Sequence, residues 1–145
     1  MPKLLLFVPC LKAVGGDDGL LTIVSLLEYV SVGIPSDEVL EPLAATNLQW
    51  QLVSVWHREP EDDSKKFEIT IDIVLPNKKA IRLYHSELKL SGRTTKVRVD
   101  GGFVFPIGLA GEHLLQIKLR EIGKGAWKLA GEYPVNVNHN GTPPL

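Results

Sequence analysis

The sequence predicts an all-β fold, a single-domain antiparallel β-sandwich of about eight strands. Apolar and polar residues alternate with a period of two in several segments, and turn-forming clusters rather than helices separate them. At 145 residues with 44% hydrophobic composition, the chain has the size of one domain with one core. We expect the sandwich to span residues 1–138, followed by a polar C-terminal tail at residues 139–145.

The first strand is expected within the segment PKLLLFVPCLK, residues 2–12. The segment begins like a lipoprotein signal, but its apolar run covers only residues 4–8, and Pro9 stands where a small residue is needed. A secretion signal requires an apolar run of about 7 to 15 residues. We therefore expect a buried strand, in which Cys10 is a small buried hydrophobe. A lone cysteine favours a reducing compartment, so we expect a cytoplasmic protein.

The second strand is expected over residues 20–32, as a long central strand buried on both faces. The segment is apolar on both parities and rich in β-branched residues, which is typical of such a strand. A helical stripe capped by Asp17 or Asp18 is the alternative. Residues 36–45 follow without alternation, and we expect at most one short helical turn there, starting at Ser36.

Three later segments alternate clearly and predict half-buried strands: residues 46–56, 67–75 and 112–120. The alternation places Trp50 and Trp56 in the core. It also turns His113 inward, where we expect a structural histidine with a hydrogen bond to upstream backbone.

The order of these features resembles a known family. An apolar first strand ends near PCLKAV, a GGDDG turn leads into a second apolar strand, and a late FPIGLAGEHLLQIKL segment opens into a final hairpin. Together they resemble a family of uncharacterised bacterial single-domain proteins of unknown function with an Ig-like or C2-like sandwich. The resemblance implies a fold, but it implies no activity and no catalytic or binding residues.

The sequence offers little for catalysis. The four histidines lie about thirty residues apart, and neither a nucleophile elbow nor a phosphate-binding loop is present. We therefore expect no enzymatic activity and no cofactor. The acidic turns raise the hypothesis of a C2-like calcium site, because Ca²⁺ needs roughly 6 to 8 oxygen ligands. The candidate ligands are Asp17, Asp18, Asp62, Asp63 and Asp100.

Binding is the expected function. The net charge of −1 and an aromatic content of 7% argue against nucleic acid, and no apolar stretch reaches the roughly 20 residues that would span a membrane. We expect a self-associating protein-interaction module that pairs through apolar edges flanking residues 20–32 or 127–137. The alternative is a small-molecule or carbohydrate site. Its candidate residues, for a partner or for a ligand, are Trp127, Tyr133 and Phe103.

Overall fold

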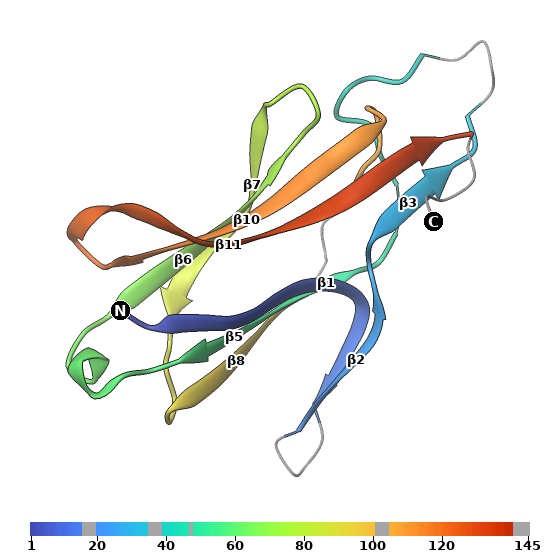
Figure 1. Cartoon of the computed structure of the whole chain (residues 1–145). Coiled ribbons are helices and arrows are strands. Elements are labelled where there is room, and N and C mark those ends of the chain that lie inside the picture. Colours follow the sequence, from blue (N-terminus) through green and yellow to red (C-terminus); the bar gives the residue numbers. More distant parts are fainter. Residues whose placement is uncertain (16–19, 35–38, 47, 101–104, 141–145) are drawn as a thin grey trace.

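The predicted all-β sandwich is confirmed by a computed structural model of the chain, in which several antiparallel sheets form a sandwich-like arrangement (Figure 1). The structure describes residues 1–15, 20–34, 39–46, 48–100 and 105–140. Eleven strands lie within these residues, more than the eight expected. They are β1 (Lys3–Gly15), β2 (Leu21–Leu26), β3 (Tyr29–Val32), β4 (Ala45–Thr46), β5 (Gln51–His57), β6 (Phe67–Val74), β7 (Ala80–Leu88), β8 (Thr94–Asp100), β9 (Phe105–Pro106), β10 (Gly111–Glu121) and β11 (Lys124–His139).

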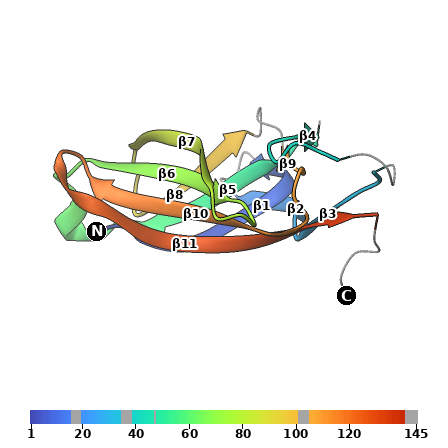
Figure 2. The same ribbon diagram turned by 90° about the horizontal axis from the view of Figure 1, so that it is seen from above.

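Two main sheets make up the sandwich. A four-stranded sheet has the order β2-β1-β5-β8, and a five-stranded sheet has the order β3-β11-β10-β6-β7. Neighbouring strands are antiparallel, except that β3 runs parallel to β11. The two-residue strands β4 and β9 form a separate ladder at one end of the molecule (Figure 2). Strands this short show no alternation, which is why the pattern did not reveal them.

The N-terminal segment is an internal strand, as expected. β1 pairs with β2 on one side and with β5 on the other. Cys10 is fully buried in it, and burial raises the pKa of the Cys10 thiol.

The prediction of one central strand, or of a helix, over residues 20–32 is wrong. The segment forms two edge strands, β2 and β3, one in each main sheet. Leu27 lies between them: its side chain enters the core, and its N–H donates to Pro9 O at 3.0 Å. Because the chain passes from one sheet to the other, its buried side changes, and residues of both parities are apolar. The sequence pattern alone does not separate this arrangement from a strand buried on both faces.

The helical turn expected from Ser36 onward falls in part on residues that the structure does not describe. Residues 35–38 are outside the described part of the chain, residues 42 and 43 form a plain turn, and β4 begins at Ala45. The helical segment that the structure describes is a 3₁₀ turn at Pro60–Asp62. β11 continues through His139, the first residue of the expected tail, and Asn140 Oδ1 accepts a hydrogen bond from Ile34 N at 2.5 Å.

The core between the two main sheets follows the predicted alternation. Trp50 and Trp56 are both buried, and the ring centroids of Trp50 and Phe105 lie 5.2 Å apart. His113 is fully buried as well, and its Nδ1–H donates to Gly111 O at 3.2 Å, upstream as expected. The predictions of these inward side chains are therefore confirmed.

Candidate functional site

The hairpin of β1 and β2, of which β2 ends its sheet, carries exposed apolar side chains. The hairpin extends away from the rest of the sandwich (Figure 1). We call these side chains the hairpin patch; they are 41 to 66% exposed and comprise Leu11, Val14, Leu20, Val24 and Leu26. Scattered exposed apolar residues are ordinary, but several on one hairpin are typical of an interaction surface.

The β2 edge also lacks the charges that protect other edges. The edge strand β8 carries Lys96 and Arg98, and the edge strand β7 carries Arg82 and Glu87. β2, by contrast, contains no charged residue and no proline. Such residues on edge strands prevent pairing with another chain, so β2 is the better suited of these three to pairing. Its regular stretch is short, since Ser25 has a left-handed φ of 55°.

Contacts to β5 and β8 hold the hairpin in place. Gln51 Oε1 accepts a hydrogen bond from Ala13 N at 2.7 Å, and Arg98 Nη1 donates to Ala13 O at 3.2 Å. A small second core lies beneath these bonds. It is formed by Val8, Cys10, Ala13 and Val53, with Leu21 and Ile23 packed against it. The hairpin is therefore anchored on its inner side while the hairpin patch stays exposed.

Trp127, a predicted binding residue, contacts other side chains of its own chain. The Arg120 guanidinium lies 4.3 Å from the centroid of its ring, and the His85 ring packs edge-on at 5.7 Å. Glu68 joins these two side chains, accepting from Arg120 Nε at 2.5 Å and from His85 Nε2 at 3.0 Å. Hydrogen bonds from His85 and then Arg120 lower the pKa of Glu68. Trp127 thus covers a charged cluster on the outer face of the five-stranded sheet.

Tyr133 lies on the opposite face of β11 from Trp127. It packs against both core clusters, and burial, followed by the charge of Glu28, raises the pKa of its hydroxyl. The change of face follows from a bulge, because Ile117 pairs with Gly131 while Lys118 pairs with Leu129 and leaves one extra residue between them. The structure therefore does not bring Trp127 and Tyr133 into one pocket. Phe103 lies outside the described residues.

The acidic candidates do not converge on one point. Asp62 is buried, where Oδ2 accepts from Glu59 N and Oδ1 lies 3.1 Å from the Met1 amino group. Asp63 accepts two 2.7 Å hydrogen bonds from Arg93, which hold the pKa of Asp63 below its usual value.

Asp100 lies at the other end of β8 from this acidic turn, because Asp100 pairs with Gln51 while Thr94 pairs with His57. Asp17 and Asp18 are outside the described part of the chain. Within the described ranges, no group of three or more His, Cys, Asp or Glu side chains is placed to hold a metal ion. The charges of Asp62 and Asp63 are instead matched by nearby cations.

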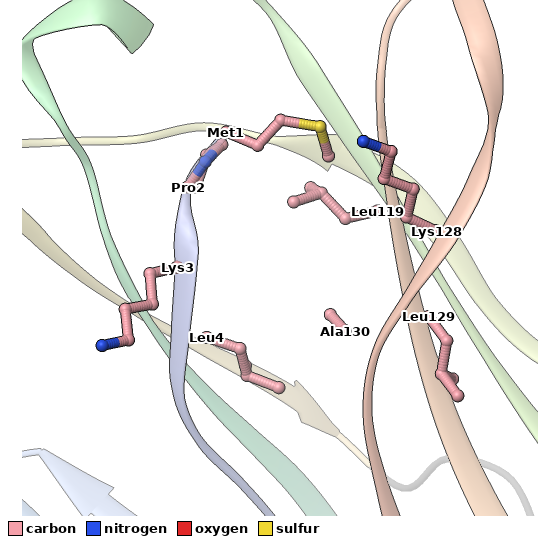
Figure 3. A pocket seen from close by; sticks show the side chains of 8 residues that line it. All are labelled: Met1, Pro2, Lys3, Leu4, Leu119, Lys128, Leu129 and Ala130. Carbon is pink, nitrogen blue, oxygen red and sulfur yellow. The ribbon is translucent and has the colours of Figure 1, made fainter.

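A groove between β1 and β11 is a feature that the sequence did not predict. It has a volume of about 270 Å³ and is lined by Met1, Pro2, Lys3, Leu4, Leu119, Lys128, Leu129 and Ala130. Figure 3 shows Leu4, Leu119 and Ala130 inside it, while Lys128 lies at its rim. Its two walls are more than a hundred residues apart in sequence, so no local motif could reveal the groove.

An exposed segment at the other end of the sandwich was also missed. Val39 is 94% exposed and Leu43 is 61% exposed, with the exposed Glu41 between them. The backbone beneath is closely packed, since a Cβ on Gly108 would lie 1.9 Å from Glu41 O. The sequence did contain a signal for an exposed segment, namely apolar and acidic residues between two prolines. That pattern was interpreted only as a connection between strands.

No protein-family model matches the chain, and no curated protein sequence matches it. Two solved structures resemble its fold at low similarity. The N-terminal domain of PorA is 8% identical, with 95% of this chain and 100% of that chain covered at a TM-score of 0.28. The CooA pilin subunit from enterotoxigenic Escherichia coli is 13% identical, with 94% and 99% covered at a TM-score of 0.26. Likenesses at this level assign neither a family nor a function.

No helix in the described ranges is long and apolar enough to cross a membrane.

Proposed function

We propose that this chain is a non-catalytic protein-interaction module that associates with itself through the edge of β2. The observation that carries the proposal is an edge strand without charge, flanked by the exposed apolar side chains of the hairpin patch. An open edge presents backbone donors and acceptors that a second strand can satisfy. In a symmetric pair, two β2 strands would run antiparallel about a two-fold axis and extend the four-stranded sheet into the second copy.

The partner in this proposal is therefore another copy of the chain rather than nucleic acid or a membrane. The proposed compartment is the cytoplasm. The free thiol of Cys10 agrees with this compartment, because it is buried and forms no disulfide bond that the fold would need for stability.

Sedimentation velocity over a wide range of protein concentration tests the proposal. We expect a concentration-dependent dimer, and we expect Thr22→Lys to shift the dimer to monomer because lysine on an edge disfavours strand pairing. Thr22 is exposed on β2, and Thr94 is exposed on the edge strand β8. Thr94→Lys is therefore the matched control, and it should dimerise as the unmodified chain does. A chain that stays monomeric at millimolar concentration, or a Thr22→Lys variant that dimerises normally, would contradict the proposal.

The alternative function is the binding of a small molecule. Trp127 and Tyr133 lie on different faces of β11 and therefore do not form the expected aromatic pocket. The observation that favours ligand binding is the groove of about 270 Å³ between β1 and β11. Its volume is slightly below the roughly 300 to 1,000 Å³ that is usual for ligand sites. Native mass spectrometry of the purified chain tests this alternative. A monomer with added mass would support it, and a bare dimer would favour self-association.

A further inference from the structure

We infer that the groove between β1 and β11 binds the Val39–Leu43 segment of a second copy of the chain, so that copies associate head to tail. This inference rests on the proposed self-association, but it uses a different surface from the β2 edge. It begins from two unexplained features, an apolar groove at one end of the sandwich and an exposed apolar segment at the other.

The groove suits an apolar side chain with a negative charge close by. Its interior is formed by Leu4, Leu119 and Ala130, and the ionisable side chains that line it, Lys3 and Lys128, are both cationic. Figure 3 shows the amino group of Lys128 near the side chains of Met1 and Leu119, whereas the amino group of Lys3 points away. Neither lysine forms an ion pair with a described residue. An occupant with a carboxylate would therefore meet an unmatched positive charge.

The Val39–Leu43 segment has the matching chemistry. Val39 and Leu43 are the most exposed and the third most exposed of the large apolar side chains that the structure describes. Glu41 stands between them, exposed and without an ion pair among the described residues. In an extended segment, residues two apart share a side and lie about 7 Å from each other. In the bound copy we expect the Val39 side chain in the groove and the Glu41 carboxylate beside Lys128.

The segment is also held in position before binding. Ala44 N donates to Glu41 O at 2.9 Å, and the backbone of Glu41 and Pro42 fits closely over Gly108. A side chain at Gly108 would collide with this backbone, so glycine allows the segment to lie where it does. Because the backbone of Glu41 and Pro42 is held by its own chain, little conformational entropy is lost at these two residues when the segment binds.

The contact must be between copies rather than within one. The groove lies at the end of the sandwich that holds the N-terminus, and the segment that contains Val39 lies at the opposite end (Figures 1 and 2). Each copy would therefore offer a groove at one end and a segment at the other. Such a head-to-tail contact does not close on itself unless the rotation between copies forms a ring, so it generates open chains. The interface is small, and we expect weak binding by each contact.

The test is a titration of the full-length chain with a capped peptide of residues 39–44, VLEPLA, followed by backbone amide NMR. The Thr22→Lys variant is used, so that pairing at β2 does not interfere. We expect the peptide to shift the resonances of Leu4, Leu119 and Ala130. We expect Lys128→Glu to weaken binding about tenfold or more, because it places like charges together. Lys79→Glu makes the same change of charge in a turn away from the groove and should bind normally.

A charge-reversed peptide, VLKPLA, completes the design. It should bind the Lys128→Glu variant more tightly than it binds the chain with Lys128. The inference is overturned if millimolar VLEPLA shifts no groove resonance, if the shifts lie elsewhere, or if Lys128→Glu binds VLEPLA unchanged. The outcome is separate from that of the β2 proposal. A Thr22→Lys variant that associates as the unmodified chain does would disprove β2 pairing, and binding of VLEPLA in its groove would still support this contact.

Discussion

Leu4 of β1 packs directly over the backbone of Gly131 in β11, and the two main sheets approach each other closely there. A Cβ on Gly131 would lie 2.6 Å from Leu4 Cδ2. Gly131 has no left-handed φ, so the reason for glycine at this position is space rather than backbone conformation. Leu4 also lines the groove between β1 and β11.

We predict that Gly131→Val destabilises the domain by about 1–3 kcal/mol, because overpacking moves Leu4 and the strand that carries it. Leu4→Ala in the same chain should recover part of the loss, since it removes the atom that the new side chain meets. Urea denaturation of the two single variants and the double variant measures the coupling. Strictly additive changes in the free energy of unfolding would show that the two residues do not compete for space.

We predict that the domain loses stability in mild acid because His113 is buried in the core. Burial is the largest cause that lowers the pKa of His113 below 6.5; the hydrogen bond to Gly111 opposes it, and the electrostatic interaction with the nearby His139 ring lowers it further. The folded state thus resists protonation that the unfolded state accepts. The contribution of neutral His113 to the free energy of unfolding is fully present above pH 6.5. It falls as the pH drops toward the lowered pKa, by up to about 1.4 kcal/mol per pH unit. Urea denaturation at pH 7.5 and at pH 5.5 measures the loss.

The control for this prediction is His113→Leu, which cannot be protonated. Its free energy of unfolding should fall less between the two pH values than that of the unmodified chain, because the other histidines are common to both proteins. An equal fall in both proteins would assign the acid sensitivity to other groups.

The turn between β6 and β7 predicts a stabilising substitution. Lys78 has a left-handed φ of 71°, which costs a residue with a Cβ about 1–2 kcal/mol. Lys78→Gly should therefore raise the free energy of unfolding by about 0.5–1 kcal/mol, after the entropy that glycine loses on folding. The adjacent Lys79 has no left-handed φ, so Lys79→Gly should destabilise. Thermal melting of the two variants gives opposite shifts if the backbone conformation is the cause.

Removal of residues 1–10 should abolish cooperative folding. β1 lies between β2 and β5, and the deletion removes Phe7 from the main core and Val8 and Cys10 from the second core. Circular dichroism and thermal melting measure the result. A truncated chain that stays in solution and melts cooperatively would show that this segment is dispensable for the fold.

Alternation in the sequence predicted the parts of the fold that have one buried face. Trp50, Trp56 and His113 were placed inward because their neighbours alternate with them, and the structure agrees. The same signal failed for residues 20–32. The chain changes sheets there at Leu27, and apolar residues occupy both odd and even positions. A single strand buried on both faces and two successive strands that bury opposite sides both show apolar residues at odd and even positions.

The candidate site was less predictable than the fold. The uncharged edge of β2 lies in residues 20–32, a segment expected to be a central strand with pairing edges beside it. The groove depends on strands that are distant along the chain. Trp127 and Tyr133 have the same parity, which suggests a shared face, and only the bulge at Ala130 separates them. Bulges of one residue leave no reliable mark in composition, so the face of a residue beyond one cannot be counted from sequence.

The parallel pairing of β3 with β11 has a consequence for synthesis of the chain on the ribosome. Tyr29 to Val32 pair with Asn136 to His139, residues that are made more than a hundred positions later. The hairpin of β6 and β7 needs only neighbouring segments and can form early, whereas β3 must wait for β11 to emerge. During that interval β3 lacks its partner, and its exposure to other nascent chains depends on the speed of translation.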